Sequence, residues 1–505
     1  MQSILNKEDK FIYLLYVILL TALYFYFPFS AEDSYIVARY AYNFGTYGEL
    51  AYNIEEPISA LTSPFHAILE GLLYSLIKYD PVVIWKFFSV ILLFLTIGIL
   101  QSLLISKSQK TFFFISVALS SSILLWTVGG LETPLLMFLV SLFTLIFLKK
   151  NTDNINALIL LGILSGVIFL TRFDSAIFLL PISLYILWFN KDRLSNISAF
   201  LIPAICIVLL WFVFSKLYYG HFMPTSFFAK KPGLSIQDII ATLSGLLWTG
   251  ALPIAGYVLY QKNEFLSSSK NKIILIGLFF VILYMFTMAN KHMMFSFRAF
   301  VPYLPIVFFI LILLKKKISK IAIALLLIFQ LGSLYTTYNF GINYPVAELI
   351  EREIVPIKYK KYFHNQYALL TIPSYIEFMN SLHQQGVLIN RDWKSRKILR
   401  KAIVLTYAEG VASYSGINNY YTGSLVTKGA CRKPDYIMGL HFLDAKKSLH
   451  GINSNNKFLS NELNFYVLNN RENAILSVSR YDDLNEINKK ALWRWINSCN
   501  SADIW

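Results

Sequence analysis

A series of long apolar runs is the feature that most constrains how this chain can fold. Candidate membrane spans are 11–29, 82–105, 112–128, 133–148, 155–170, 174–189, 197–217, 239–260, 272–289, 299–314 and 319–338. Hydrophobic residues make up 56% of the 505-residue chain and charged residues only 15%, whereas soluble domains are about a quarter charged. The sequence therefore predicts a mostly α-helical, polytopic transmembrane bundle with about eleven spans.

The N-terminal segment and the net charge are both consistent with a polytopic membrane protein. The first run, 11–29, follows a charged start and lacks a small-residue cleavage site, so we expect a retained span rather than a removed signal peptide. The chain has 45 Lys and Arg residues against 29 acids, a net charge of +16. In a membrane protein such an excess is typical of cytoplasmic loops, and we expect no nucleic-acid partner.

The loops between the runs form two alternating sets of different charge. The strongly basic set comprises Lys107/Lys110, Lys149/Lys150, Lys191/Arg193, Lys262/Lys270/Lys272 and Lys315–Lys317/Lys320. The other set has single, mixed charges and comprises 129–134, 171–174, 218–237 and 290–298. Because positive loops stay in the cytoplasm, the second set is expected outside. Lys7 and Lys10 likewise place the N-terminus in the cytoplasm.

A further apolar segment, 58–77, is interrupted by Pro64, His66 and Glu70. Counting it as a span would invert every later loop relative to the N-terminus. We therefore predict a helix that lies on or dips into the outer face, within an outer loop 30–80. The chain then divides into a membrane module, 1–339, and a C-terminal domain outside the cytoplasm, 340–505.

The C-terminal region is less hydrophobic, and its ~165 residues suffice for a core of its own. The segment 403–416 (IVLTYAEGVASYSG) predicts a strand, a glycine turn and a short helix. The segment 432–440 predicts a turn and a strand, and 462–469 predicts an edge strand. We expect a soluble α/β domain. In an oxidising compartment Cys431 and Cys499 have two alternatives, a disulfide or two free thiols.

Two adjacent acids, Glu32 and Asp33, begin the polar segment Phe29–Pro64 directly after the first span. Desolvation near a bilayer surface is expected to raise the pKa of at least one of them. A carboxylate adjusted in this way can act as a general base toward a hydroxyl. The alternative is structural, with Asp33 capping a helix over Tyr35–Asn43. A cap needs one acid, so the pair favours chemistry.

Other charged residues fall in loops of the same outer set. Glu132 follows two glycines that permit a tight turn. Arg172 and Asp174 occupy a short turn, where a structural ion pair is an equal alternative to a functional role. Arg298 begins a span, where a guanidinium can bind a lipid phosphate or extend to ordinary headgroups. The polar loop 218–232 contributes His221, Thr225, Lys230 and Lys231.

Several chemistries lack their sequence signatures here. The chain has no G-x-x-x-x-G-K-[ST] loop and no His/Cys cluster with zinc spacing. Carboxylates on one face are compatible with a divalent metal, but no spacing demands one. Because nucleotide sugars are lacking outside the cytoplasm, a sugar-transferring enzyme there needs an activated donor held in the membrane.

The series EDSYIVARYAYNFGTYGELAYN…EEPISALTSP resembles the first outer loop of C-type glycosyltransferases, in particular bacterial arabinofuranosyltransferase-like proteins that use polyprenyl-phosphate sugars. Further motifs of that superfamily follow in order: WTVGGLETPL (126–135), LTRFD (170–174), YYGHFMPTSFFAK (218–230), RAFVPYLP (298–305), AEG (408–410) and KPDY (433–436). The match covers most of the chain through motifs that are each weak alone. One departure is Glu32, where the superfamily usually has Asp, and this favours Asp33 as the base without excluding Glu32.

The resemblance implies an inverting glycosyltransferase of the bacterial inner membrane. It would move a monosaccharide, hexose or pentose, from a polyprenyl-phosphate carrier to a hydroxyl of a cell-envelope glycan or glycolipid, such as lipopolysaccharide, at the periplasmic face. Asp33 or Glu32 would be the base, and Arg298, Lys230 and Arg172 would bind the donor phosphate. The expected acceptor and supporting residues are Glu132, Asp174, His221, Tyr35 and Arg39.

Two other functions remain as alternatives. A lipid-linked glycan flippase or transporter would be expected to show internal repeats and ionisable groups near the midplane, whereas the charged groups here lie at the ends of the runs. A glycan polymerase or ligase would use a diphosphate-linked oligosaccharide and transfer a block rather than one sugar.

Overall fold

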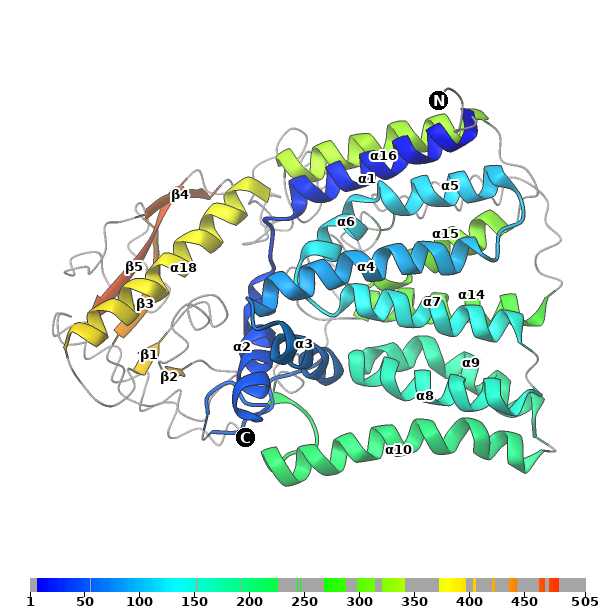
Figure 1. Ribbon diagram of the computed structural model, residues 1–505, viewed down its shortest axis with the longest axis horizontal. Helices are drawn as coiled ribbons and strands as arrows, with labels where there is room; N and C mark the ends of the chain where they lie inside the picture. Colours follow the sequence, from blue (N-terminus) through cyan, green and yellow to red (C-terminus); the bar gives the residue numbers. More distant parts are fainter. Residues whose placement is uncertain are drawn as a thin grey trace.

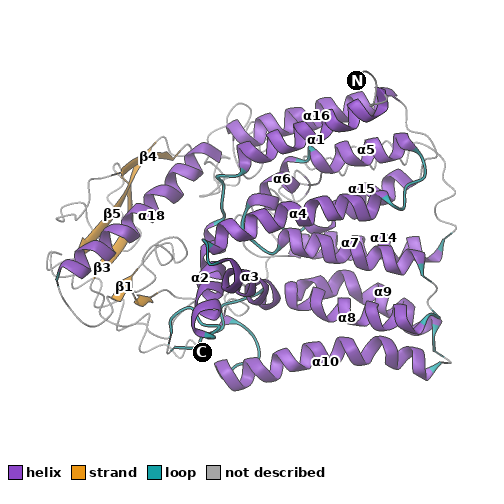
Figure 2. Ribbon diagram, in the orientation of Figure 1, coloured by secondary structure: helices purple, strands orange, loops and turns teal. Residues whose placement is uncertain are grey.

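The computed structural model describes residues 7–54, 56–150, 153–191, 193–225, 243, 246, 268–287, 298–313, 320–340 and 372–396, together with five strands between 403 and 480. These residues form a bundle of apolar helices with a smaller part containing a sheet beside one end of it (Figure 1). Figure 2 shows strands only in that smaller part. The predicted mostly α-helical, membrane-type architecture is confirmed.

The long helices of the bundle follow the apolar runs. They are α1 Lys7–Tyr26, α4 Pro81–Gln101, α5 Lys107–Ala118, α6 Ser121–Val128, α7 Thr133–Lys149, α8 Ile155–Thr171, α9 Ala176–Phe189, α10 Leu194–Tyr219, α14 Ser269–Thr287, α15 Leu304–Leu313 and α16 Lys320–Phe340. Within the described ranges three of these, α4, α10 and α14, are individually long and apolar enough to cross a membrane. The run 239–260 lies mostly outside the described residues, so eleven spans remain an expectation.

One predicted span is two helices. The run 112–128 forms the end of α5 and all of α6, which are bent by 58° at the break between them and together pass the length and hydropathy test for a span. α6 begins after Ser120, whose backbone is extended. The nearby Ser121 and Ser333 hydroxyls are 2.8 Å apart, so a buried polar contact joins α6 to α16.

Close approach of backbones at glycines holds α8 against α10. A Cβ added at Gly162 would collide with the carbonyl oxygen of Phe200. A Cβ at Gly166, one turn later, would lie 2.9 Å from the Cβ of Ile207. Two glycines four residues apart form one small face of a helix, and such faces let membrane helices approach closely.

Two further helices, α2 (Glu32–Tyr47) and α3 (Pro64–Ile77), lie at one end of the bundle, where α2 runs across the helix ends (Figure 1). Pro64 is at the first position of α3, where a proline is well tolerated. α2 and α3 cross at Gly45, where an added Cβ would lie 2.6 Å from the Gly71 carbonyl oxygen. A helix within 58–77 therefore exists, as predicted, and it packs on α2 and α4.

The remaining part contains α18 (Ile372–Ser395) and a five-stranded sheet of order β2-β1-β3-β5-β4. The strands are β1 Ile403–Leu405, β2 Tyr420–Thr422, β3 Tyr436–Phe442, β4 Leu463–Val467 and β5 Glu472–Arg480. β1 is parallel to β2 and β3, whereas β5 is antiparallel to β3 and β4. β4 lies at an edge of this sheet, where an edge strand was expected. Cys431 and Cys499 lie outside the described residues.

Candidate active site

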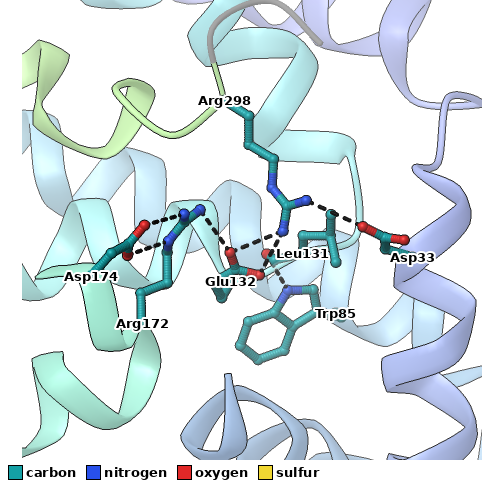
Figure 3. Close-up of polar contacts among 7 residues, drawn as sticks. All are labelled: Asp33, Trp85, Leu131, Glu132, Arg172, Asp174 and Arg298. Carbon is teal, nitrogen blue, oxygen red and sulfur yellow. Dashed lines mark hydrogen bonds and ion pairs between the residues drawn. The ribbon is translucent and has the colours of Figure 1, made fainter. Parts of the chain in front are cut away.

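A row of alternating charges begins in α2 and joins residues from the ends of several helices (Figure 3). In order along the row the residues are Asp33, Arg298, Glu132, Arg172 and Asp174. They come from the first turn of α2, the residues before η5 (Val301–Tyr303), the N-cap of α7, the C-cap of α8 and η1 (Phe173–Ser175). Five of the residues expected from the sequence are thus brought together from four distant segments.

Glu132 is the centre of this row and is only 2% exposed. Arg298 Nη2 donates to both of its carboxylate oxygens, at 3.0 and 3.1 Å, and Arg172 Nη1 donates to Oε1 at 3.3 Å. Burial alone would raise the pKa of Glu132, but the two guanidinium groups outweigh burial and lower it to about 2. Glu132 therefore stays ionised and fixes the two arginines relative to one another.

The turn before Glu132 is joined to the start of α2. The Ala31 N–H donates to the Gly129 carbonyl at 2.9 Å. Gly130 has a φ of 79°, and a Cβ there would lie 2.8 Å from the Cβ of Ser34. Only glycine combines that conformation with that contact at low cost. The two glycines thus set the distance between Asp33 and Glu132.

Arg298 connects the buried and the exposed ends of the row. Its Nη1 lies 3.5 Å from Asp33 Oδ2, and its Cζ lies 5.1 Å above the Trp126 ring. Its side chain is 10% exposed, whereas that of Asp33 is 64% exposed. The Nε atom is buried and has no hydrogen-bond partner among the described residues. A mostly desolvated cation beside an accessible carboxylate is suited to bind an anionic oxygen.

Arg172 and Asp174 form the ion pair that the sequence left as one of two alternatives. Arg172 Nε and Nη2 donate to the two Asp174 oxygens at 2.8 and 2.6 Å. Burial would lower the pKa of Arg172, but the charges of Asp174 and Glu132 raise it. The Arg172 guanidinium is already paired with both Asp174 and Glu132, so it holds Glu132 in place more than it is available to bind an anion.

The two adjacent acids differ in environment. Asp33 is exposed, so the desolvation expected from the sequence does not apply to it, whereas Glu32 is partly buried. The Glu32 N–H donates to the Tyr375 hydroxyl at 3.1 Å. α2 begins at Glu32, and its N-cap residue is Ala31, which makes no side-chain capping hydrogen bond. The alternative in which Asp33 caps a helix over Tyr35–Asn43 is therefore wrong, and an accessible Asp33 side chain remains.

The other expected site residues lie elsewhere or are not described. Arg39 is buried and donates to the Tyr52 carbonyl at 2.6 Å and to Asn53 Oδ1 at 3.2 Å, so it shapes the loop after α2. The Tyr35 hydroxyl interacts with the Ser30 side chain. His221 is exposed, and its backbone carbonyl accepts from Ser215 at 2.8 Å. Lys230 lies outside the described residues.

A buried pair, His66 and Glu70, is linked to the charge row through Trp85 and was not expected as part of the site. His66 Nε2 and Glu70 Oε2 are 3.2 Å apart, both side chains are fully enclosed, and burial raises the pKa of Glu70 despite the nearby His66. The His66 ring centroid lies 4.2 Å from that of Trp85. Trp85 Nε1 donates to the Leu131 carbonyl at 2.9 Å, directly before Glu132. The interruption of 58–77 by two polar residues was the available signal.

The row does not fit a divalent metal as it stands. Its acids alternate with guanidinium groups, which repel a second cation and occupy the carboxylate oxygens. Among the described residues no group of three or more His, Cys, Asp and Glu side chains is arranged to hold a metal.

Comparison with solved structures shows the fold. The structure of ArnT from Cupriavidus metallidurans bound to undecaprenyl phosphate matches with a TM-score of 0.58 and 10% identity, covering 93% of this chain and 98% of that chain. The same protein in the apo state matches with a TM-score of 0.62 and 11% identity, covering 94% and 98%. No protein-family model matches the chain, and no curated protein matches it by sequence. At identities of 10 and 11%, these matches show that the fold is shared.

Proposed function

We propose that this protein is an integral membrane glycosyltransferase that takes a monosaccharide from a polyprenyl-phosphate carrier. The observation that supports this most is the position of Arg298, whose guanidinium lies between the accessible Asp33 carboxylate and the buried Glu132. A general base and a phosphate-binding cation at adjacent positions are the two groups that displacement of a lipid phosphate by a hydroxyl needs. The fold shared with ArnT, which binds undecaprenyl phosphate, supports the donor class.

The proposed reaction is an in-line displacement at the anomeric carbon. Asp33, or Glu32 beside it, removes the proton of the acceptor hydroxyl as its oxygen forms the new bond. The bond from the anomeric carbon to the phosphate oxygen breaks, and the carrier phosphate leaves with the electron pair. Arg298 stabilises the charge that develops on that phosphate, with Lys230 as a second candidate. Attack opposite the leaving group inverts the anomeric centre.

Glu132 allows Arg298 to bind the phosphate while Asp33 acts as the base. With Glu132 ionised, Arg298 is held in place by a strong pair on one side and can exchange its 3.5 Å contact with Asp33 for a phosphate oxygen on the other. Release of Asp33 from Arg298 at that moment makes its carboxylate a better base. Arg172 and Asp174 keep Glu132 in position.

We further propose that the charge row lies on the periplasmic face of a bacterial inner membrane and that 340–505 form an α/β domain on that side. The acceptor is then a hydroxyl of a cell-envelope glycan or glycolipid. The separation of charges supports this orientation. Glu132 precedes α7 and Lys149 ends it, so the charge row and a basic loop lie at opposite ends of the bundle. Arg193 and Asp153 pair at 3.3 Å in loops at that second end.

The test uses the full-length protein in proteoliposomes, supplied with polyprenyl-phosphate donors that each bear one radiolabelled sugar and with an envelope glycolipid extract as acceptor. Asp33→Asn and Glu32→Gln are compared with Asp153→Asn, which removes an acid paired to an arginine at the other end of the bundle. Loss of a general base is expected to slow transfer by about 10²- to 10⁴-fold, with little change in donor KM. Full transfer in both acid variants would contradict the assignment of the base.

The same assay separates the two alternatives. A flippase would move the donor lipid between leaflets without forming a product. A polymerase or ligase would add a block of several sugars, whereas the proposed enzyme adds one.

A further inference from the structure

Tyr375 on α18 reaches the helix that holds the proposed base. Its hydroxyl accepts the hydrogen bond from the Glu32 N–H at 3.1 Å, and 343 positions separate the two residues in the chain. Tyr375 is buried. We infer that Tyr375 is a positioning residue that sets the orientation of the first turn of α2 and thereby of Asp33. This inference rests on the proposed function, in which Asp33 or its neighbour is the base.

The first turn of α2 needs an outside partner. The first N–H groups of any helix have no partner within the helix. In α2 the N-cap residue is Ala31, whose side chain has no acceptor and makes no capping hydrogen bond. The Tyr375 hydroxyl fills this role for Glu32, one residue from Asp33. A rotation of this turn would move the Asp33 carboxylate relative to Arg298, 3.5 Å away.

The Tyr375 ring also contacts the other side of the site. Its centroid lies 5.3 Å from that of Phe29, which meets Trp126 edge-on at 6.3 Å. Trp126 in turn lies beneath the Arg298 guanidinium at 5.1 Å. The hydroxyl therefore contacts the helix of the base, and the ring belongs to an aromatic series that ends at the proposed phosphate-binding arginine.

The hydroxyl keeps its proton over the working pH range. Burial, followed by the charge of Glu32, raises the pKa of Tyr375 well above its ordinary value. α18 itself packs against α16, β4 and β5. Tyr375 is thus a neutral, fixed contact through which the part of the chain that contains the sheet orients the base.

The decisive variant is Tyr375→Phe, which keeps the ring and removes only the acceptor oxygen. We expect kcat to fall by about 10- to 100-fold because the base is misplaced, while donor KM changes less than about twofold, since Arg298 and its aromatic support are intact. The matched control is Tyr26→Phe, which removes another buried hydroxyl, one that donates to the Leu334 carbonyl at 3.2 Å. A kcat unchanged in Tyr375→Phe would overturn the inference, as would an equal loss in both variants.

Hydrogen exchange gives a readout that does not need activity. In Tyr375→Phe the amides of residues 30–34 should exchange faster than in wild type, and in Tyr26→Phe they should not. If the wild type transfers no sugar from any donor but this exchange difference is present, the proposed function fails while the orienting contact stands. Unchanged exchange in Tyr375→Phe would refute the contact itself.

Discussion

Glu132 is buried among groups whose effects on its ionisation oppose one another. Burial would favour the protonated acid, and two arginines favour the carboxylate strongly enough to lower its pKa to about 2. Because the pKa in the folded protein lies below the ordinary value, the charge stabilises the fold above a pH of about 4.5. That stabilisation is lost as the pH falls toward 2.

Replacement of Glu132 by Gln is expected to lower the stability of the folded protein by about 3 kcal/mol at neutral pH, since two buried arginines lose a shared partner. The difference from wild type should shrink as the pH falls from about 4.5 toward 2. Thermal unfolding in detergent at several pH values measures it. A difference independent of pH would mean that Glu132 is not an ionised partner of Arg298 and Arg172.

Among individual residues, the sequence predicted the charged residues of the row but not the residues that hold them in position. Asp33, Glu132 and Arg298 are charges at the ends of apolar runs, and a charge in such a place is conspicuous. Tyr375 and Trp85 act through a hydroxyl and an indole N–H that pair with backbone groups. Aromatic residues are common in this chain, so neither had a distinguishing signal. Arg39 was expected at the site because it is charged, yet its charge holds a loop.

Among the elements, α8 and α10 approach one another closely at two glycines of α8. We expect Gly162→Ala to lower the melting temperature of the detergent-solubilised protein by several degrees, because its Cβ would collide with the Phe200 carbonyl. Gly98→Ala in α4 is the matched control, since a Cβ there meets nothing within 4 Å. That variant should be neutral or slightly stabilising. Equal melting temperatures for the two variants would show that α8 and α10 are not closely packed.

Apolar periodicity predicted helices over the described runs but not how each is interrupted. The run 112–128 has three consecutive serines at 120–122, where the 58° bend lies, and the contact of Ser121 with Ser333 in α16 is remote in sequence. The helix within 58–77 was predictable, because Pro64 begins it and two polar residues make it a poor span. Strand order in the sheet depends on pairings between distant segments, which no local pattern specifies.

For the whole molecule, the separation of acidic and basic loops predicts which end faces the cytoplasm. In a variant whose three native cysteines are replaced by serine, Tyr47→Cys and Ile105→Cys introduce single exposed thiols. A membrane-impermeant maleimide should label position 47 in intact spheroplasts and position 105 only after permeabilisation. The reverse pattern would invert the proposed topology and place the charge row inside the cell.

The contacts that complete the charge row join segments made at very different times during synthesis. Arg298 is synthesised 166 positions after Glu132, and Tyr375 is synthesised 343 positions after Glu32. At about 5–20 residues per second, the second delay is roughly 17 to 70 s. Until these residues are made, Glu132 lacks the Arg298 guanidinium and the Glu32 N–H lacks the Tyr375 hydroxyl. A chain that ends before residue 298 therefore lacks both the Arg298–Glu132 pair and the Tyr375 contact with the first turn of α2.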